Sequence, residues 1–342
     1  MMSFKKRLAA GVAVVSALSM GLAGCGSASD GASDAASDGD VVNITYMHRL
    51  PDGDGMTLVN DIVAKWNEAH PDIQVKATKF DGNAADMIKK LENDVKSGEA
   101  PDLAQVGYAE LPEVFTKDML QDVTEYAEQY ESDFASGPYS LMGIGGKYYG
   151  LPQDTGPLLY FYNAAEFEKL GIEVPSSADE LIASAKKAAE SGKYILSYQA
   201  DEAGNMLTGL AGASGGWYKV EDDSWVVDTQ TSGSEAVADV FQQLIDAKAV
   251  ATAQRWDASF DASLQDGSLI GTVAAAWEAP LFMTSAGDTG AGDWRVAQLG
   301  DWFGNGGKTG PDGGSGVAVL KGSEHPKEYL FSNFLNHLKI LK

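Results

Sequence analysis

Tryptophans stand at several positions where strands or turns are predicted to end, and such rings could hold a hydroxyl-rich molecule. A sugar has apolar C–H faces that pack on flat aromatic rings, and hydroxyls that pair with carboxylates, amides and guanidinium groups. Four tryptophans fall at such positions: Trp217, Trp256, Trp277 and Trp302. Packing in a core is the alternative for each of them. Trp66 differs, because it belongs to the apolar stripe of a predicted helix and is expected in the core.

Polar side chains that could pair with hydroxyls occur in the same predicted loops. Arg49 offers a fork of donors, with a surface salt bridge as the alternative role. A carboxylate such as Asp154 could instead stabilise a turn. Ser315 follows Gly313 and Gly314, which would let a ligand approach the backbone closely, although a flexible turn explains these glycines equally well. The polar candidates are His48, Arg49, Tyr108, Glu110, Asp154, Asn205, Glu278 and Ser315.

Two kinds of enzyme could use some of these residues. Gly212-Ala213-Ser214-Gly215-Gly216, with His325 downstream, fits the nucleophile pattern of serine hydrolases. That pattern needs a strand before the serine and a helix after it, whereas a helix-like stretch precedes Ser214 and an extended one follows. A glycoside hydrolase would need only a pair of the many carboxylates, and the sequence does not show which carboxylates pair. The hydrolases therefore remain the alternative reading to a protein that binds a sugar without altering it.

Sites for phosphate or metal have no convincing spacing. Gly306-Gly307-Lys308-Thr309 lacks the first glycine of a phosphate loop, because Trp302 stands there. Asp52 and Asp54 suggest calcium only faintly, since Met56 occupies the third ligand position. The four histidines are scattered and the chain has a single cysteine. We expect neither a cofactor nor a metal.

The elements that would position the candidate residues begin with an alternation of strands and helices. Short apolar runs predict strands at 42–47, 73–77 and 103–106, and apolar residues at helical spacing predict helices at 58–66 and 84–95. This order implies a parallel sheet with right-handed crossovers, in which ligands bind beyond the carboxyl ends of the strands. The loops at 48–55 and 108–110 should therefore share one edge.

A second α/β set follows a crossing rich in Gly and Pro at 145–157. Strands are predicted at 158–162, 194–197, 269–275, 294–299 and 316–320. The run at 294–299 is expected to lead the chain back toward the first set. Ser177 with Glu180 forms a capping box that opens a helix, and further helices are predicted near 237–245 and 326–338.

The N-terminus has the features of an export signal. Lys5, Lys6 and Arg7 precede a small, apolar stretch at 8–22 that is too short for a spanning helix. Residues 22–25, Leu-Ala-Gly-Cys, resemble the bacterial lipobox, which implies a lipid on Cys25, with an ordinary secretory signal as the alternative. Residues 26–40 contain only Gly, Ser, Ala and Asp, so we expect a flexible tether that reaches about 20 Å.

Size and charge restrict the remaining possibilities. About 300 residues follow the tether, more than one hydrophobic core usually organises. Removal of residues 1–24 would change the net charge from −24 to −27, and such a charge argues against nucleic acid or anionic lipid as partners. No later apolar run approaches a membrane span. The sequence contains no internal repeat of the kind that adhesins of this size usually have.

Several segments in this order resemble family 1 extracellular solute-binding proteins of ATP-binding-cassette importers, the group that includes maltose-binding protein. They are residues 22–40, 67–73, 100–103, 149–152, 276–278 and 313–316. The resemblance implies a two-lobed α/β fold of the periplasmic-binding-protein type 2, each lobe a mostly parallel sheet flanked by helices, with hinge strands between the lobes and ligand trapped in the cleft. It also implies a lipid-anchored monomer on the extracellular face of the membrane, with an oligosaccharide as ligand and the transmembrane permease subunits as partners.

The domain limits follow from these predictions. We expect a signal peptide at 1–24, the lipidated cysteine and tether at 25–40, a first lobe at 41–152 to which 295–342 return, and a second lobe at 153–294. Members of the family usually continue beyond a helix near Leu338. The second lobe is therefore expected to lack its usual C-terminal helices.

Overall fold

The structure is a computed structural model, and it describes residues 41–52, 56–200, 203–214, 217–222, 224–255, 257–290 and 293–324. The chain divides into a unit of residues 1–39 and a unit of residues 40–342. The predicted signal, Cys25 and the tether lie outside the described residues. So do Trp256, His325 and the helix predicted at 326–338.

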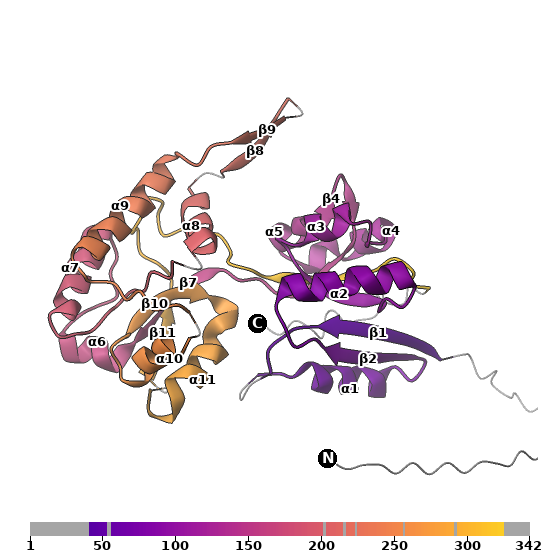
Figure 1. The fold of residues 1–342 in the computed structure, drawn as a ribbon, viewed down its shortest axis with the longest axis horizontal. Helices are drawn as coiled ribbons and strands as arrows, with labels where there is room; N and C mark the ends of the chain where they lie inside the picture. The colour runs from indigo at the N-terminus through magenta and orange to yellow at the C-terminus, as the bar shows by residue number, and fades with distance from the viewer. Residues whose placement is uncertain are drawn as a thin grey trace, which may run out of the picture. The chain divides into compact units, whose positions relative to one another are not determined.

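The first sheet begins with the predicted alternation of strands and helices (Figure 1). Its first three strands and the helices between them are β1 (Val42–His48), α1 (Val59–Ala69), β2 (Ile73–Lys79), α2 (Ala84–Ser97) and β3 (Leu103–Gly107). Strand β1 pairs in parallel with both β2 and β3. The ends of α2 follow from its sequence, because Asn83 Oδ1 accepts the backbone N–H of Asp86 and Gly98 ends the helix with a φ of +74°.

The rest of this sheet comes from residues far along the chain. The elements after β3 are α3 (Leu111–Thr116), α4 (Thr124–Ala127), η1 (Glu128–Asp133), α5 (Ser136–Leu141), β4 (Gly143–Ile144), β5 (Lys147–Tyr148) and β6 (Gly150–Pro152). Strand β12 (Ser315–Val319) then inserts between β3 and β6, antiparallel to both, which gives the order β2-β1-β3-β12-β6. We call residues 41–152 and 313–324 the first lobe.

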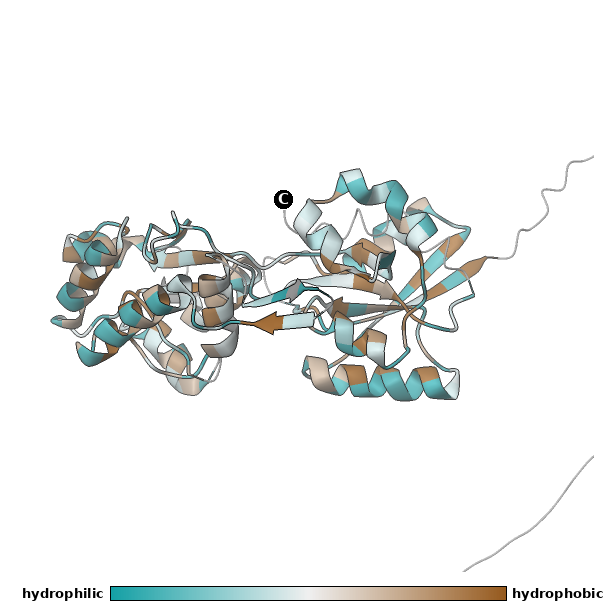
Figure 2. Cartoon of the chain, turned by 90° about the horizontal axis from the view of Figure 1, so that it is seen from above, coloured by the Kyte–Doolittle hydropathy of each residue, from teal (hydrophilic) through white to brown (hydrophobic). Residues whose placement is uncertain are grey.

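The first lobe buries an apolar core on each face of its sheet. One core gathers Trp66 with Ile44, Tyr46 and Leu151, and the other gathers Met87 with Met47, Tyr108 and Tyr149. Alternate residues of β1 therefore serve opposite faces, as the period of a strand requires. Along the helices of the chain, hydrophobic residues are interleaved with hydrophilic ones (Figure 2), which is the pattern of helices that cover a sheet on one side.

The second sheet has the order β10-β7-β11, formed by β7 (Leu158–Asn163), β10 (Gly271–Ala275) and β11 (Trp294–Ala297). Around it lie α6 (Ala164–Leu170), α7 (Ala178–Ala189), α8 (Ala203–Gly212), α9 (Ser232–Asp246), α10 (Ala258–Gln265), η2 (Ala276–Glu278) and α11 (Ala279–Gly290). We call residues 158–311 the second lobe. Its larger core includes Tyr160, Leu181, Phe241 and Trp302.

The mostly parallel sheet expected in each lobe needs correction. The three named strands of the second sheet pair antiparallel, and parallel pairing there is confined to isolated bridges such as Tyr194 to Leu269. In the five-stranded sheet of the first lobe two pairings are parallel and two are antiparallel. Hydrophobic periodicity identifies a strand, but the direction of pairing depends on neighbours far away in the sequence.

The chain also returns to the first lobe later than expected. β11 pairs with β7 of the second sheet, with Arg295 opposite Tyr162. Beyond it, Leu299, Trp302 and Phe303 are buried in the core of the second lobe. The run predicted to lead back at residue 295 therefore belongs to the second lobe, and the return occurs at residues 312–315. The free energy gained by burying these large apolar side chains keeps the segment after residue 295 in the second lobe, instead of leading it directly back to the first.

Two segments connect the lobes, residues 153–157 and residues 311–314, and backbone hydrogen bonds join them. The N–H of Asp312 donates to the carbonyl of Gly156 at 2.7 Å, and Pro157 and Pro311 form an antiparallel bridge. The N–H of Gln153 donates to the carbonyl of Ser315 at 2.9 Å. We call this pair of segments the crossing.

A hairpin of β8 (Tyr218–Glu221) and β9 (Ser224–Val227) projects beyond α8 and α9 (Figure 1). Tyr218 lies opposite Val227 on the face that also carries Trp225, and Trp225 is 75% exposed. Among the described residues, no helix is long and apolar enough to span a bilayer.

Candidate ligand-binding site

The loops after β1 and β3 meet at the carboxyl edge of the first sheet, as predicted. The backbone N–H of Arg49 donates to Oε1 of Gln105 at 2.9 Å. The guanidinium of Arg49 lies 3.3 Å from Oε1 of Glu110. Both side chains remain about 30% exposed, so the ion pair leaves part of each group open to solvent. Arg49 thus forms a salt bridge, the other role that the sequence left open for it. The bridge lies at the edge of the sheet where ligands are expected.

Asp154 and Ser315 form the centre of the site on the first lobe. Asp154 Oδ1 accepts the backbone N–H of Ser315 at 2.6 Å, and Oδ2 accepts its hydroxyl at 3.1 Å. The hydroxyl oxygen in turn accepts from Nε2 of Gln105 at 3.0 Å. Burial raises the pKa of Asp154, while the two bonds from Ser315 act in the opposite direction. The carboxylate therefore holds the end of the crossing against β12.

Tyr108 joins the same network from β3. Its hydroxyl donates to the carbonyl of Asp154 at 2.7 Å, and its backbone N–H donates to the carbonyl of Gly314 at 3.1 Å. Burial is the main cause that raises the pKa of Tyr108, so its hydroxyl stays protonated as a donor. Four predicted residues, Arg49, Tyr108, Asp154 and Ser315, are thus linked through Gln105 and the backbone.

Trp277 comes from the second lobe and reaches the crossing. Its indole Nε1 donates to the carbonyl of Asp312 at 3.0 Å. A Cβ added at Gly313 would stand 3.3 Å from this Nε1, and one added at Gly314 would stand 2.9 Å from the Tyr108 ring. The two glycines have φ values of +69° and +92°. The pair therefore allows rings from both lobes to approach one short stretch of backbone.

Glu278 sits in a buried charge cluster beside Trp277. Its side chain is 0% exposed, and Oε1 accepts from Arg255 at 2.7 Å and from the N–H of Ala275 at 2.9 Å. Asp312 lies 3.6 Å from the same guanidinium. Burial raises the pKa of Glu278 to about 7, although Arg255 and the Ala275 bond lower it. Oε2 of Glu278 has no hydrogen-bond partner among the described residues.

Two predicted residues are placed in cores instead of at this site. Trp302 is 1% exposed, donates through Nε1 to the carbonyl of Pro175 at 2.8 Å and packs edge-on against Tyr160. His48 is 3% exposed, stacks on Tyr46, and accepts the N–H of Leu50 through Nδ1 at 3.3 Å. Burial lowers the pKa of His48. Trp302 thus has the core packing that was the alternative to stacking, and His48 is buried with little of its ring open to a ligand.

Two further predicted residues, Trp217 and Asn205, belong to the second lobe. Trp217 is half-buried, packs against the core of the second lobe and donates through Nε1 to the Ser234 hydroxyl at 2.7 Å. Asn205 belongs to α8, and its side chain is outside the described part of the structure.

Sequence reasoning missed three polar residues that hold the site together: Gln105, Arg255 and Asp312. Gln105 lies within a strand that reads as apolar, and Asp312 lies in a turn where Asp is ordinary. A single arginine in a loop has no periodic signal. Only their partners, far away in sequence, reveal their roles.

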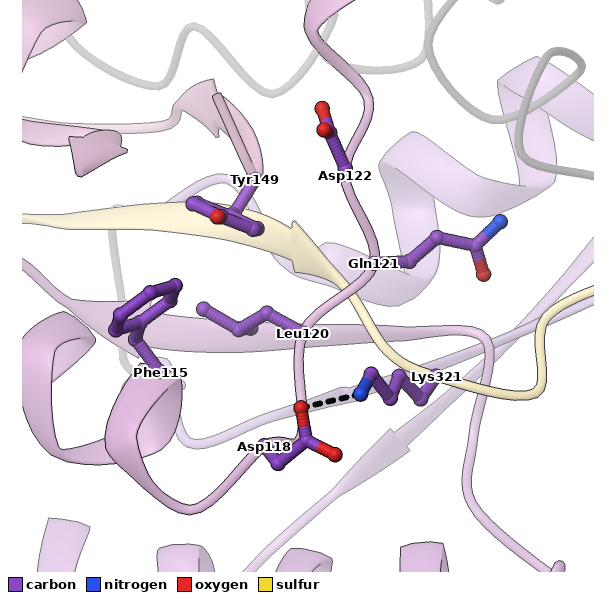
Figure 3. Close-up of a pocket in the computed structure, with 7 residues that line it drawn as sticks. All are labelled: Phe115, Asp118, Leu120, Gln121, Asp122, Tyr149 and Lys321. Carbon is purple, nitrogen blue, oxygen red and sulfur yellow. Dashed lines mark hydrogen bonds and ion pairs between the residues drawn. The ribbon is translucent and has the colours of Figure 1, made fainter. Parts of the chain in front are cut away.

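A pocket of about 380 Å³ lies elsewhere (Figure 3). Phe115, Leu120 and Tyr149 face one another there, and Asp118 forms an ion pair with Lys321. Leu120 bridges to Leu320, beyond the end of β12. This is the amino edge of the parallel strands, opposite the edge where ligands of such sheets bind. We therefore take the Trp277 network, and not this pocket, as the candidate ligand site.

The serine-hydrolase pattern lacks its structural context. Ser214 follows α8 directly, so the strand that a nucleophile elbow needs before the serine is a helix here. Within the described ranges, no group of three or more His, Cys, Asp or Glu side chains is arranged to hold a metal ion.

Comparison with known proteins agrees with this architecture. The model of the family "Bacterial extracellular solute-binding protein" matches residues 52–336. The galacto-N-biose-/lacto-N-biose I-binding protein of an ABC transporter from Bifidobacterium longum, solved with lacto-N-biose, is 77% identical, with a TM-score of 0.83 over 89% of this chain and 76% of that chain. The binding protein from B. animalis subsp. lactis Bl-04, solved with β-1,6-galactobiose, is 26% identical, with a TM-score of 0.68 over 87% of this chain and 72% of that chain.

A curated relative is more distant. The arabinooligosaccharide-binding protein of Halalkalibacterium halodurans is 24% identical over 300 residues, which are 84% of this chain and 65% of that protein. This chain thus spans about two thirds of that relative's length. The names of all three relatives describe binding proteins rather than enzymes. With a family match over most of its length and the two-lobed fold confirmed, the chain belongs to the bacterial extracellular solute-binding protein family.

Proposed function

We propose that this protein captures a short oligosaccharide for an ABC importer, with a galactose-containing disaccharide of the galacto-N-biose or lacto-N-biose I type as its ligand. The observation that carries this proposal is the 77% identity to a protein solved with lacto-N-biose. The site network supports it, because Trp277 supplies a half-buried aromatic surface and Arg49 and Glu110, both partly exposed, supply groups that pair with hydroxyls. Glu278 is fully buried, so it would support Trp277 rather than contact the ligand.

The ligand would be held between groups from both lobes. Trp277 follows β10 of the second sheet, while Arg49 and Glu110 lie at the edge of the first. A ligand that touches both sets only when the lobes close favours the closed state by differential binding. A shift from 1% to 99% closed requires about 5.5 kcal/mol of such binding, and the two short segments of the crossing would be the hinge.

The N-terminal features complete the proposal. A signal at 1–24 would direct export, a lipid on Cys25 would anchor the mature protein to the extracellular face of the membrane, and residues 26–40 would act as a tether. The protein would act as a monomer and deliver sugar to the transmembrane permease subunits. Labelling of the bacterial cells with a lipid precursor, compared between the natural chain and a Cys25→Ala chain, tests the anchor.

Calorimetric titration of the purified protein tests the ligand. We expect lacto-N-biose and galacto-N-biose to bind more tightly than β-1,6-galactobiose, and arabino-oligosaccharides to bind weakest. The sugar should be recovered intact after incubation, whereas cleavage would support the glycoside-hydrolase alternative. Absence of heat and of thermal stabilisation with all four sugars would refute the proposed ligand class.

A further inference from the structure

A second, smaller pocket of about 190 Å³ lies beside the crossing and shares only Asp154 with the residues of the candidate site described above. One wall is the segment that joins η1 to α5, with Phe134 and Ala135, together with Pro138 in the first turn of α5. The other is the end of β6 and the start of the crossing, with Gln153 and its neighbours. The full lining is Asp133, Phe134, Ala135, Pro138, Pro152, Gln153, Asp154 and Thr155.

Gln153 is the unusual residue in this lining. It is only 6% exposed. Its Oε1 accepts the hydroxyl of Tyr46 at 2.8 Å, but its Nε2 is buried with no hydrogen-bond partner among the described residues. A buried donor without a partner costs about 1–3 kcal/mol, so native proteins nearly always provide a partner for such groups. A polar group of a bound molecule would satisfy this amide.

The chemistry of the lining selects the kind of molecule. If the two ends of the amide were exchanged, Nε2 would donate to Tyr46 and the oxygen would lack a partner instead. A hydroxyl satisfies either arrangement, because it both donates and accepts. Asp133 and Asp154 line the same pocket and disfavour an anion. Phe134, Pro138 and Pro152 offer apolar surface for the C–H groups of a polyol.

We infer that this pocket is a second binding site, which takes a small neutral polyhydroxyl compound no larger than one sugar ring. Its volume is that of about six water molecules at about 30 Å³ each. The ring stacks on Phe134 and one hydroxyl pairs with the amide of Gln153. This pocket adjoins the proposed oligosaccharide site at Asp154, but the inference does not depend on which ligand that site takes.

The position of the pocket predicts a link with the crossing. Gln153 and Asp154 both donate their backbone N–H groups to the carbonyl of Ser315, at 2.9 and 3.1 Å. Asp154 also holds the Ser315 side chain. An occupant of the pocket therefore contacts the residues that fix one end of the crossing. Any effect it has on the affinity for the oligosaccharide must be matched by an equal effect in the reverse direction.

The test uses galactose and glycerol as probes and the side-chain amide signals of Gln153 in NMR spectra, assigned by their loss in a Gln153→Leu protein. The Trp277→Ala protein is titrated in parallel with the natural protein, so that binding at the oligosaccharide site is weakened. We expect the Gln153 signals to shift saturably in both proteins, with galactose binding more tightly than glycerol.

Two variants locate the binding. Ala135→Leu adds bulk to the pocket without touching Gln153, and it should weaken galactose binding at least tenfold. Ser132→Leu adds a similar side chain at an exposed position of the same segment, outside the lining, and should bind like the natural protein. Unshifted Gln153 signals with both probes, or equal affinity of the Ala135→Leu protein, would overturn the inference. Neither outcome affects the disaccharide titration, which tests the proposed function.

Discussion

The indole of Trp277 donates a hydrogen bond of 3.0 Å to the backbone carbonyl of Asp312. Trp277 follows β10 of the second sheet, whereas Asp312 lies in the segment that leads back to β12 of the first. The bond fixes the edge of the aromatic ring at the crossing and leaves the ring half-buried. The proposed stacking surface for sugar is thus tied to the backbone that would act as the hinge.

Replacement of Trp277 by Ala should therefore weaken sugar binding more than it destabilises the fold. We expect the dissociation constant for the disaccharide to rise about tenfold to a hundredfold, as for an aromatic anchor at about 1.4–2.8 kcal/mol. Calorimetric titration measures the change. Trp225→Ala is the matched control, because that ring is 75% exposed on the β8–β9 hairpin, and it should bind sugar like the natural protein. Equal losses in both variants would contradict the role of Trp277.

Glu278 should make stability depend on pH. Burial raises its pKa to about 7 in the folded protein, from an ordinary value of 4.5. Between these two values the folded state holds a proton that the unfolded state has lost, so this residue's contribution is complete below about pH 4.5 and is lost as the pH rises toward 7. The difference is on the order of 3 kcal/mol.

Glu278→Gln should remove that dependence. Urea unfolding at several pH values between 4.5 and 7 would show stability falling less steeply with rising pH in the Gln variant than in the natural protein. Glu190→Gln, at an exposed helix end, should leave the slope unchanged. Parallel slopes for the Glu278→Gln and natural proteins would show that the buried carboxyl does not keep its proton.

Asp154 should stabilise the end of the crossing. Asp154→Ala removes the acceptors of the Ser315 N–H and hydroxyl, and a buried donor left without a partner costs about 1–3 kcal/mol. We expect a loss of free energy of unfolding in that range, measured with urea. Asp72→Ala, at an exposed turn, should change stability by less than about 0.5 kcal/mol. A similar small change for Asp154→Ala would mean that water replaces the lost bonds.

Gly314 allows a test of how closely the Tyr108 ring approaches the backbone of the crossing. Gly314→Ala would place a Cβ 2.9 Å from the Tyr108 ring and 3.2 Å from the Cα of Thr155, at a φ of +92°. Gly98→Ala is the control for backbone strain alone, since Gly98 has a φ of +74° and nothing within 4 Å of the added atom. We expect a loss of about 1–2 kcal/mol at Gly98 and a larger one at Gly314. Thermal and urea unfolding of both variants would measure these losses of stability. Equal losses would show that the Tyr108 ring moves aside without further cost.

Much of the fold could be predicted from local patterns. The strands at 42–48, 73–79 and 103–107 and the helices between them match their apolar spacing. Their order requires crossover connections, so the loops with Arg49 and Glu110 could be predicted to share one edge, and the two side chains do meet there. The cap of α7 could also be predicted, because the Ser177 hydroxyl accepts the N–H of Glu180. The second bond of the capping box differs, because the Glu180 carboxylate accepts the backbone N–H of Ser176 instead of that of Ser177.

Other features were decided only by tertiary structure. A tryptophan in a predicted loop could stack on a sugar or fill a core, and burial separated Trp302, at 1% exposure, from the half-buried Trp277. The partners of Glu278 were equally invisible, because Arg255 and Asp312 lie 23 residues before it and 34 residues after it in the sequence.

The amino-acid sequence by itself determined the alternation of elements, the capping residues and the kinds of side chain at the carboxyl edge of the first sheet. Hydrophobic spacing and turn chemistry act over a few residues, so they can be read without coordinates. The antiparallel second sheet, the late return of the chain and the buried Glu278 cluster were decided by contacts between distant segments. Those contacts depend on which surfaces bury each other, and that is a property of the folded chain as a whole.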